Sequence, residues 1–218
     1  MQTLRIFVSS PGDVAAERAA VRRVIDELEG SHLLRDKVNF QLVAWDDPYA
    51  ASPMEAGVTP QDSVNRYSGR PSDCDLTLVI LWSRIGTVLP PDILRWDGSR
   101  YGSGTVWEFE DAINAHRPVW LYRRTSKPQI DIDDSDFDAK RSQYAAVNTF
   151  FGAFKNADGS LGSGVNKYTD PADFARLLRQ HLEAFVNECL SRNQNEPGVG
   201  KKSLPKPVLR LPSVTSGK

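Results

Sequence analysis

The chain has 218 residues, a formal net charge of -1 and two cysteines. This length suits one domain with a tail, and near-neutral charge predicts no membrane partner and no direct nucleic-acid binding. Cys74 and Cys189 lie too far apart for metal-ligand spacing and build no disulfide framework. The first residues lack an export signal, and no apolar run approaches the roughly 20 residues of a spanning helix. We therefore expect a cytoplasmic protein.

Strand-like and helix-like segments alternate along the chain. Short apolar runs bounded by turn residues predict strands at 4–9, 38–45, 75–82, 118–123 and 165–168. Helical periodicity predicts helices from Pro11 to near Gly30, then at 60–67, 105–116 and 139–154, and a last one after Asp170-Pro171. In the first helix the apolar positions share one face, and Glu17 and Arg18 fall on the other.

This alternation predicts an α/β fold, a flavodoxin-like parallel five-stranded sheet with helices on both faces. Segment 75–82 (DLTLVILW) is the most continuously apolar run, so we expect it near the sheet centre. We assign residues 1–192 to one domain. Residues 193–218, rich in Asn, Pro, Gly, Lys and Ser, are predicted to be a flexible linker or tail.

Ligands of open α/β sheets bind at the carboxyl ends of the strands. The sequence contains none of the common motifs for phosphate loops, zinc or nucleophilic serine, so the candidates are polar and aromatic residues at strand ends. The long loop 83–102 is also predicted to be functional. The candidate ligand-binding residues are Ser9, Ser10, Trp45, Asp46, Trp82, Ser83 and Arg84, and Glu108 follows in the next helix. Hydroxyls, carboxylates, an arginine and aromatic rings suit a phosphorylated, ring-bearing ligand.

Several motifs carry a resemblance to a known family. Residues 7–14 read FVSSPGDV and residues 74–87 read CDLTLVILWSRIGT. A third segment contains Ser103-Gly104-Thr105, then Trp107-Glu108-Phe109, and then Ala112. In this order, over roughly residues 4–190, the chain resembles TIR-like (Toll/interleukin-1 receptor-like) domains of bacterial defence proteins.

The resemblance implies a function and a catalytic residue. TIR enzymes carry a glutamate after the third strand, followed by an apolar residue and, four places on, by a small one, which matches Glu108, Phe109 and Ala112. Such an enzyme cleaves the nicotinamide-ribose bond of NAD, and a carboxylate stabilises the cationic ribose in the transition state. Because nicotinamide is already a cationic leaving group, no metal and no cofactor beyond NAD as substrate is expected. Glu110, about 200° around the helix, is predicted to be silent.

The implied role is that of an NAD glycohydrolase or cyclase, an effector of anti-phage defence activated by self-association or by a sensor joined through the tail. Whether its product is linear or cyclic stays open. One alternative is a non-catalytic TIR-like interaction module, and a second is an enzyme like the nucleoside 2-deoxyribosyltransferases.

Structural interpretations of the same residues stay open as well. Thr105 to Glu108 reads as a capping box, with Thr105 as the cap and Glu108 at the third helical position. Ser10 to Asp13 reads as a helix start with an acidic first turn. Trp45 and Trp82 would then be packing residues.

Overall fold

The computed structural model describes residues 1–44, 69–155 and 164–195. Its centre is a five-stranded, wholly parallel sheet with the strand order β2-β1-β3-β4-β5. The strands are β1 (Gln2–Ser9), β2 (Val38–Val43), β3 (Leu76–Leu81), β4 (Val119–Arg124) and β5 (Val165–Tyr168). This order is that of flavodoxin-like folds, so the predicted fold class is confirmed.

Strand β3 lies between β1 and β4, at the centre of the sheet. All six of its residues are buried, because helices cover the sheet on both faces and leave no polar surface for them to meet. The predicted central position of the most apolar segment is therefore confirmed.

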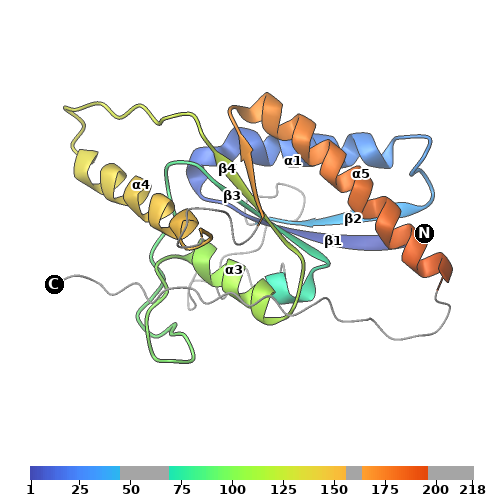
Figure 1. The fold of residues 1–218 in the computed structure, drawn as a ribbon, viewed down its shortest axis with the longest axis horizontal. Coiled ribbons are helices and arrows are strands. Elements are labelled where there is room, and N and C mark those ends of the chain that lie inside the picture. Colours follow the sequence, from blue (N-terminus) through green and yellow to red (C-terminus); the bar gives the residue numbers. More distant parts are fainter. Residues whose placement is uncertain (45–68, 156–163, 196–218) are drawn as a thin grey trace, which may run out of the picture.

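Two helical layers enclose the sheet (Figure 1). Helices α1 (Ala15–Glu29) and α5 (Pro171–Asn195) cover one face, where their apolar residues pack on Ile6, Leu78 and Tyr122. Helices α3 (Gly104–Asn114) and α4 (Phe137–Gly152) cover the other. There, four phenylalanines pack edge to face and form an aromatic cluster under the sheet: Phe109, Phe150, Phe151 and Phe154.

The bounds of several helices differ from the predicted ones. A short 3-10 helix, Gly12–Val14, precedes α1, and α4 begins at Phe137 rather than at residue 139. Helix α5 continues to Asn195, so the first residues of the predicted tail are helical. Asp170 caps its start as predicted, because its carboxylate accepts the backbone N–H groups of Ala172 and Asp173.

The predicted helix at 60–67 and the tail from residue 196 lie outside the described residues. A second 3-10 helix, Pro71–Asp73, leads into β3. Within the described ranges, none of the helices combines the length and the apolarity that a membrane span requires.

Candidate functional site

The strand order reverses between β1 and β3: the chain passes from β1 outward to β2 on one side, and from β3 outward to β4 on the other. At such a reversal the loops that follow the two strands diverge to opposite faces and leave a crevice at their carboxyl ends. Strand β1 ends at Ser9, which lies opposite Val79 of β3. The candidate ligand-binding residues after these two strands therefore lie where this fold is expected to form its ligand-binding crevice.

Ser9 and Glu108 meet below this edge. The Ser9 hydroxyl donates a hydrogen bond of 2.6 Å to Oε2 of Glu108. Ser9 is fully buried and Glu108 is 9% exposed. A short hydrogen bond to a carboxylate is charge-assisted and about twice as strong as a neutral one. The structure thus joins two residues that the sequence named separately, and holds one oxygen of Glu108 in a fixed place.

The capping-box interpretation of Glu108 is wrong. The residue that caps α3 is Ser103, whose hydroxyl oxygen accepts the backbone N–H of Val106 and whose O–H donates to the carbonyl of Ile85. Helix α3 therefore starts at Gly104, earlier than predicted, and Glu108 is not at the third helical position. Packing decides this start, because the loop after β3 approaches the helix closely at Gly86. There φ is +108° and an added Cβ would lie 2.9 Å from Oγ1 of Thr105.

Asp13 joins the two loops that flank the crevice. Its Oδ2 accepts hydrogen bonds from the backbone N–H of Ser83 (2.9 Å), the hydroxyl of Ser83 (2.8 Å) and the backbone N–H of Arg84 (3.1 Å). Sequence reasoning placed Asp13 in an acidic first helical turn and missed this contact. No local signal could have revealed it, since the partners lie 70 and 71 residues away.

Trp82 lies on the other face of the sheet from Glu108. It packs against the core under α1 and α5, and its indole N–H donates to the carbonyl of Ser126 at 2.7 Å. The Arg124 guanidinium covers its ring at 4.0 Å from the centroid. One face of the Trp82 ring is thus occupied within the protein.

Among the other predicted residues, Ser10 is buried and its hydroxyl accepts from Arg18 at 3.3 Å. Arg84 is exposed, and its backbone rather than its side chain meets Asp13. Trp45 and Asp46 lie outside the described residues. Within the described ranges, no three metal-binding side chains come together.

Glu17 is a buried carboxylate that sequence reasoning placed on the polar face of its helix. It is fully buried, and its Oε1 lies 3.3 Å from Nη1 of Arg124 and accepts a 3.2 Å hydrogen bond from the Tyr168 hydroxyl. Burial, and then the nearby Glu17 charge, raises the pKa of Tyr168. The predicted outward position of Glu17 is therefore wrong. Glu17 follows Val14 by three residues and precedes Val21 by four, so it shares the buried face of the helix, and the ends of β4 and β5 supply its partners.

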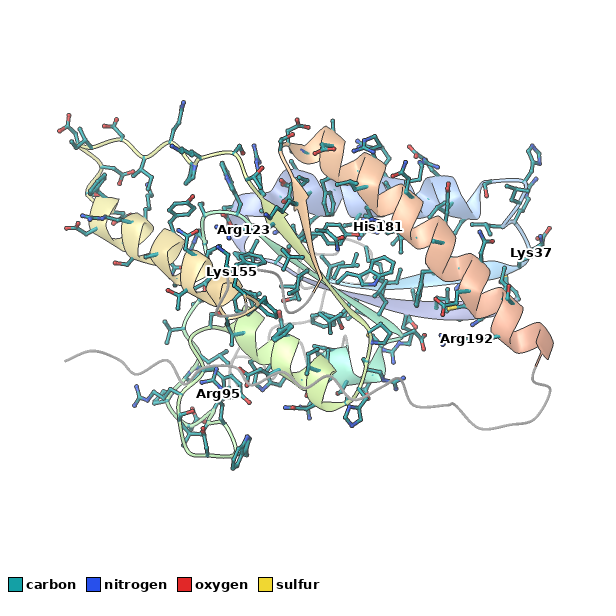
Figure 2. The ribbon with its side chains drawn as sticks, viewed as in Figure 1. Lys37, Arg95, Arg123, Lys155, His181 and Arg192 are labelled. Atoms are coloured by element: carbon teal, nitrogen blue, oxygen red, sulfur yellow. The ribbon has the colours of Figure 1, made fainter. Side chains whose placement is uncertain are left out.

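Glu110 is also engaged, although on the side of α3 away from Ser9. The Arg95 guanidinium donates to both of its carboxylate oxygens, at 2.7 to 3.1 Å, and stacks on Tyr101. Figure 2 shows Arg95 on the loop beside α3. This ion pair fastens the loop 83–102 to the helix. Glu110 is thus a structural anchor, and its silence in catalysis stays a prediction.

In a comparison with protein families, a family described as "Domain of unknown function (DUF4062)" matches residues 5–183. The match covers nearly all of the predicted domain. Comparison with curated proteins finds no match to this chain.

Among solved structures there is a weak likeness to the translation elongation factor SelB from Methanococcus maripaludis in its apo form. The two chains share 10% sequence identity with a TM-score of 0.41, over 86% of this chain and 34% of that chain. This chain thus spans about a third of that protein. A likeness at this level says nothing about activity.

Proposed function

Because the chain belongs to the DUF4062 family, whose description names no function, we propose from the site and from the TIR resemblance that it is an NAD glycohydrolase or cyclase. The substrate is NAD, and the bond cleaved joins nicotinamide to ribose. The observation that carries the proposal is the buried contact between Ser9 and Glu108 beside the crevice. Ligands of open α/β folds bind at such a strand-order reversal, which supports a role for this carboxylate in the proposed reaction.

The chemistry needs little beyond such a carboxylate. Departure of nicotinamide leaves positive charge on the ribose, and a preoriented carboxylate stabilises that charge without reorganising. Ser9 holds one oxygen of Glu108, which restricts rotation of the carboxylate and leaves the group ordered before substrate arrives. Water or a group of the substrate itself then attacks the ribose, giving a linear or a cyclic product.

The test is nicotinamide release from NAD by the full chain, followed by chromatography, for the wild type and Glu108→Gln. Glutamine keeps the size of the side chain and an oxygen for Ser9, but it cannot offset the positive charge on the ribose. We expect Glu108→Gln to abolish nicotinamide release while its thermal unfolding stays close to that of the wild type.

Glu110→Gln is the matched control, since Glu110 is on the same helix and is equally buried at 9%. It should retain nicotinamide release. It should lose about 1 to 3 kcal/mol of stability, because Arg95 keeps only a neutral partner. Activity in Glu108→Gln with loss in Glu110→Gln would show that the wrong carboxylate was chosen. Full activity in both would place the chemistry elsewhere.

A second candidate is a non-catalytic interaction module, and one observation favours it. Trp96 is 96% exposed at the tip of a turn in loop 83–102, where Leu94 and Arg100 form an isolated bridge. Tryptophan is enriched among the residues that dominate binding energy in protein interfaces. If the wild type releases no nicotinamide, this candidate replaces the enzyme.

A further inference from the structure

Two loops of different origin follow β1 and β3 at the edge where the ligand-binding crevice is expected. One is the turn between β1 and α1, which contains Asp13. The other begins directly after β3 with Trp82, Ser83 and Arg84. Neither loop is held by the sheet ladder, because both lie beyond the paired residues of β1 and β3. Their relative position therefore depends on side chains.

Asp13 makes three hydrogen bonds across this gap with a single carboxylate oxygen. Two of the donors are backbone N–H groups of consecutive residues, so the contact fixes the path of the main chain and not merely one rotamer. The other oxygen, Oδ1, is buried and has no hydrogen-bond partner among the described residues. Of the two carboxylate oxygens of Asp13, Oδ2 thus binds the loop after β3.

An acidic residue in a first helical turn is usually explained by its favourable interaction with the helix dipole, which requires no burial of the carboxylate. Asp13 is half-buried, and its carboxylate accepts hydrogen bonds from donors in another loop. The contact costs the desolvation of a carboxylate, which only well-placed donors offset. The contact with Asp13 therefore fixes the main-chain position of Ser83 and Arg84.

We propose that Asp13 is a positioning residue that holds the Ser83–Arg84 main chain in the conformation that binds the ligand. This inference rests on the proposed function for the identity of the ligand, NAD. Asp13 acts through the loop and does not take part in the bond cleavage, which belongs to Glu108. Its removal therefore weakens the binding of the substrate and of the transition state equally. Such a loss of uniform binding raises KM and leaves kcat unchanged.

The experiment compares Asp13→Ala, Asp13→Asn and the control Asp26→Ala by steady-state nicotinamide release. Asp26 is an exposed carboxylate on α1, so its removal tests the same substitution away from the crevice. We expect Asp13→Ala to raise KM for NAD about tenfold or more while kcat stays within about threefold. Asparagine retains an acceptor oxygen for the three donors, so Asp13→Asn should restore most of the affinity. Asp26→Ala should match the wild type.

Amide hydrogen exchange provides a readout that needs no ligand. In Asp13→Ala the amides of Ser83 and Arg84 should lose protection, whereas the amides of β3 should keep theirs. Unchanged exchange at Ser83 and Arg84 overturns the inference, and so does an unchanged KM in a wild type that cleaves NAD. A fall in kcat alone would overturn it too. A wild type that releases no nicotinamide would instead contradict the proposed function, and with it the identity of the ligand.

Discussion

At the scale of single residues, the carboxylates of this chain differ by the partners that the fold gives them. Glu108 accepts from a buried serine, Glu110 pairs with Arg95, and Glu17 pairs with Arg124 and Tyr168. All three are buried. A buried carboxylate needs hydrogen-bond donors or a cation: Glu110 and Glu17 each have an arginine, and Glu108 and Glu17 each accept from a hydroxyl. Glu108 differs from the other two in accepting a hydrogen bond from Ser9, at the carboxyl end of β1.

Ser9 is the residue whose replacement tests this difference most directly. We expect Ser9→Ala to lower nicotinamide release, because Glu108 loses the donor that orients it, and to lower the free energy of unfolding by about 2 kcal/mol. Urea unfolding measures the stability and chromatography the activity. The control is Ser191→Ala, which removes an exposed hydroxyl bonded to the Asn187 carbonyl. Full activity in Ser9→Ala would contradict an orienting role.

At the scale of elements, α5 and β4 meet through an aromatic contact that includes a histidine. The Tyr122 hydroxyl and Nδ1 of His181 are 2.7 Å apart, and the Trp120 ring packs edge-on against the imidazole. Figure 2 shows His181 between α5 and the sheet. Burial lowers the pKa of His181 and raises that of Tyr122, so burial favours the neutral form of both groups in this contact.

This contact predicts a pH dependence of stability. Because the folded-state pKa of His181 lies below its ordinary value of 6.5, the unfolded chain takes up the proton first. The stabilisation is complete above about pH 6.5 and is lost as the pH falls through the folded-state pKa. We expect urea unfolding at about pH 8 and about pH 5.5 to show this loss in the wild type.

His181→Gln should make the loss smaller, since glutamine accepts from Tyr122 and does not titrate. The other histidines, His32 and His116, are exposed and are present in both the wild type and His181→Gln. Their contribution to the pH dependence therefore cancels when the two are compared. An equal pH dependence in wild type and variant would exclude His181 as its source.

At the scale of the whole molecule, the proposed enzyme is expected to depend on self-association. The TIR resemblance motivates this prediction, because sites of that family are often completed by a neighbouring copy. Nicotinamide release per chain should therefore rise with protein concentration, measured over a wide dilution series together with the mass of the assembly. Turnover that stays constant while the chain remains monomeric would count against it.

The sequence by itself determined the fold class, the central place of β3 and the positions of most helices. These follow from local causes: apolar periodicity, a continuous apolar run in a strand covered on both faces, and caps such as Asp170 with Pro171. It also singled out Ser9 and Glu108, because strand ends and a family motif can be found without knowing distances.

Only the tertiary structure decided which of these residues act together. It joined Ser9 to Glu108, turned Trp82 to the opposite face and moved the cap of α3 from Thr105 to Ser103. It also buried Glu17 and tied Asp13 to Ser83. The cap of α3 moved for a nearby packing reason, the close approach of the preceding loop at Gly86. The contacts Ser9–Glu108, Asp13–Ser83 and Glu17–Arg124 join groups far apart in the chain, which meet only when parallel strands bring their carboxyl ends to one edge.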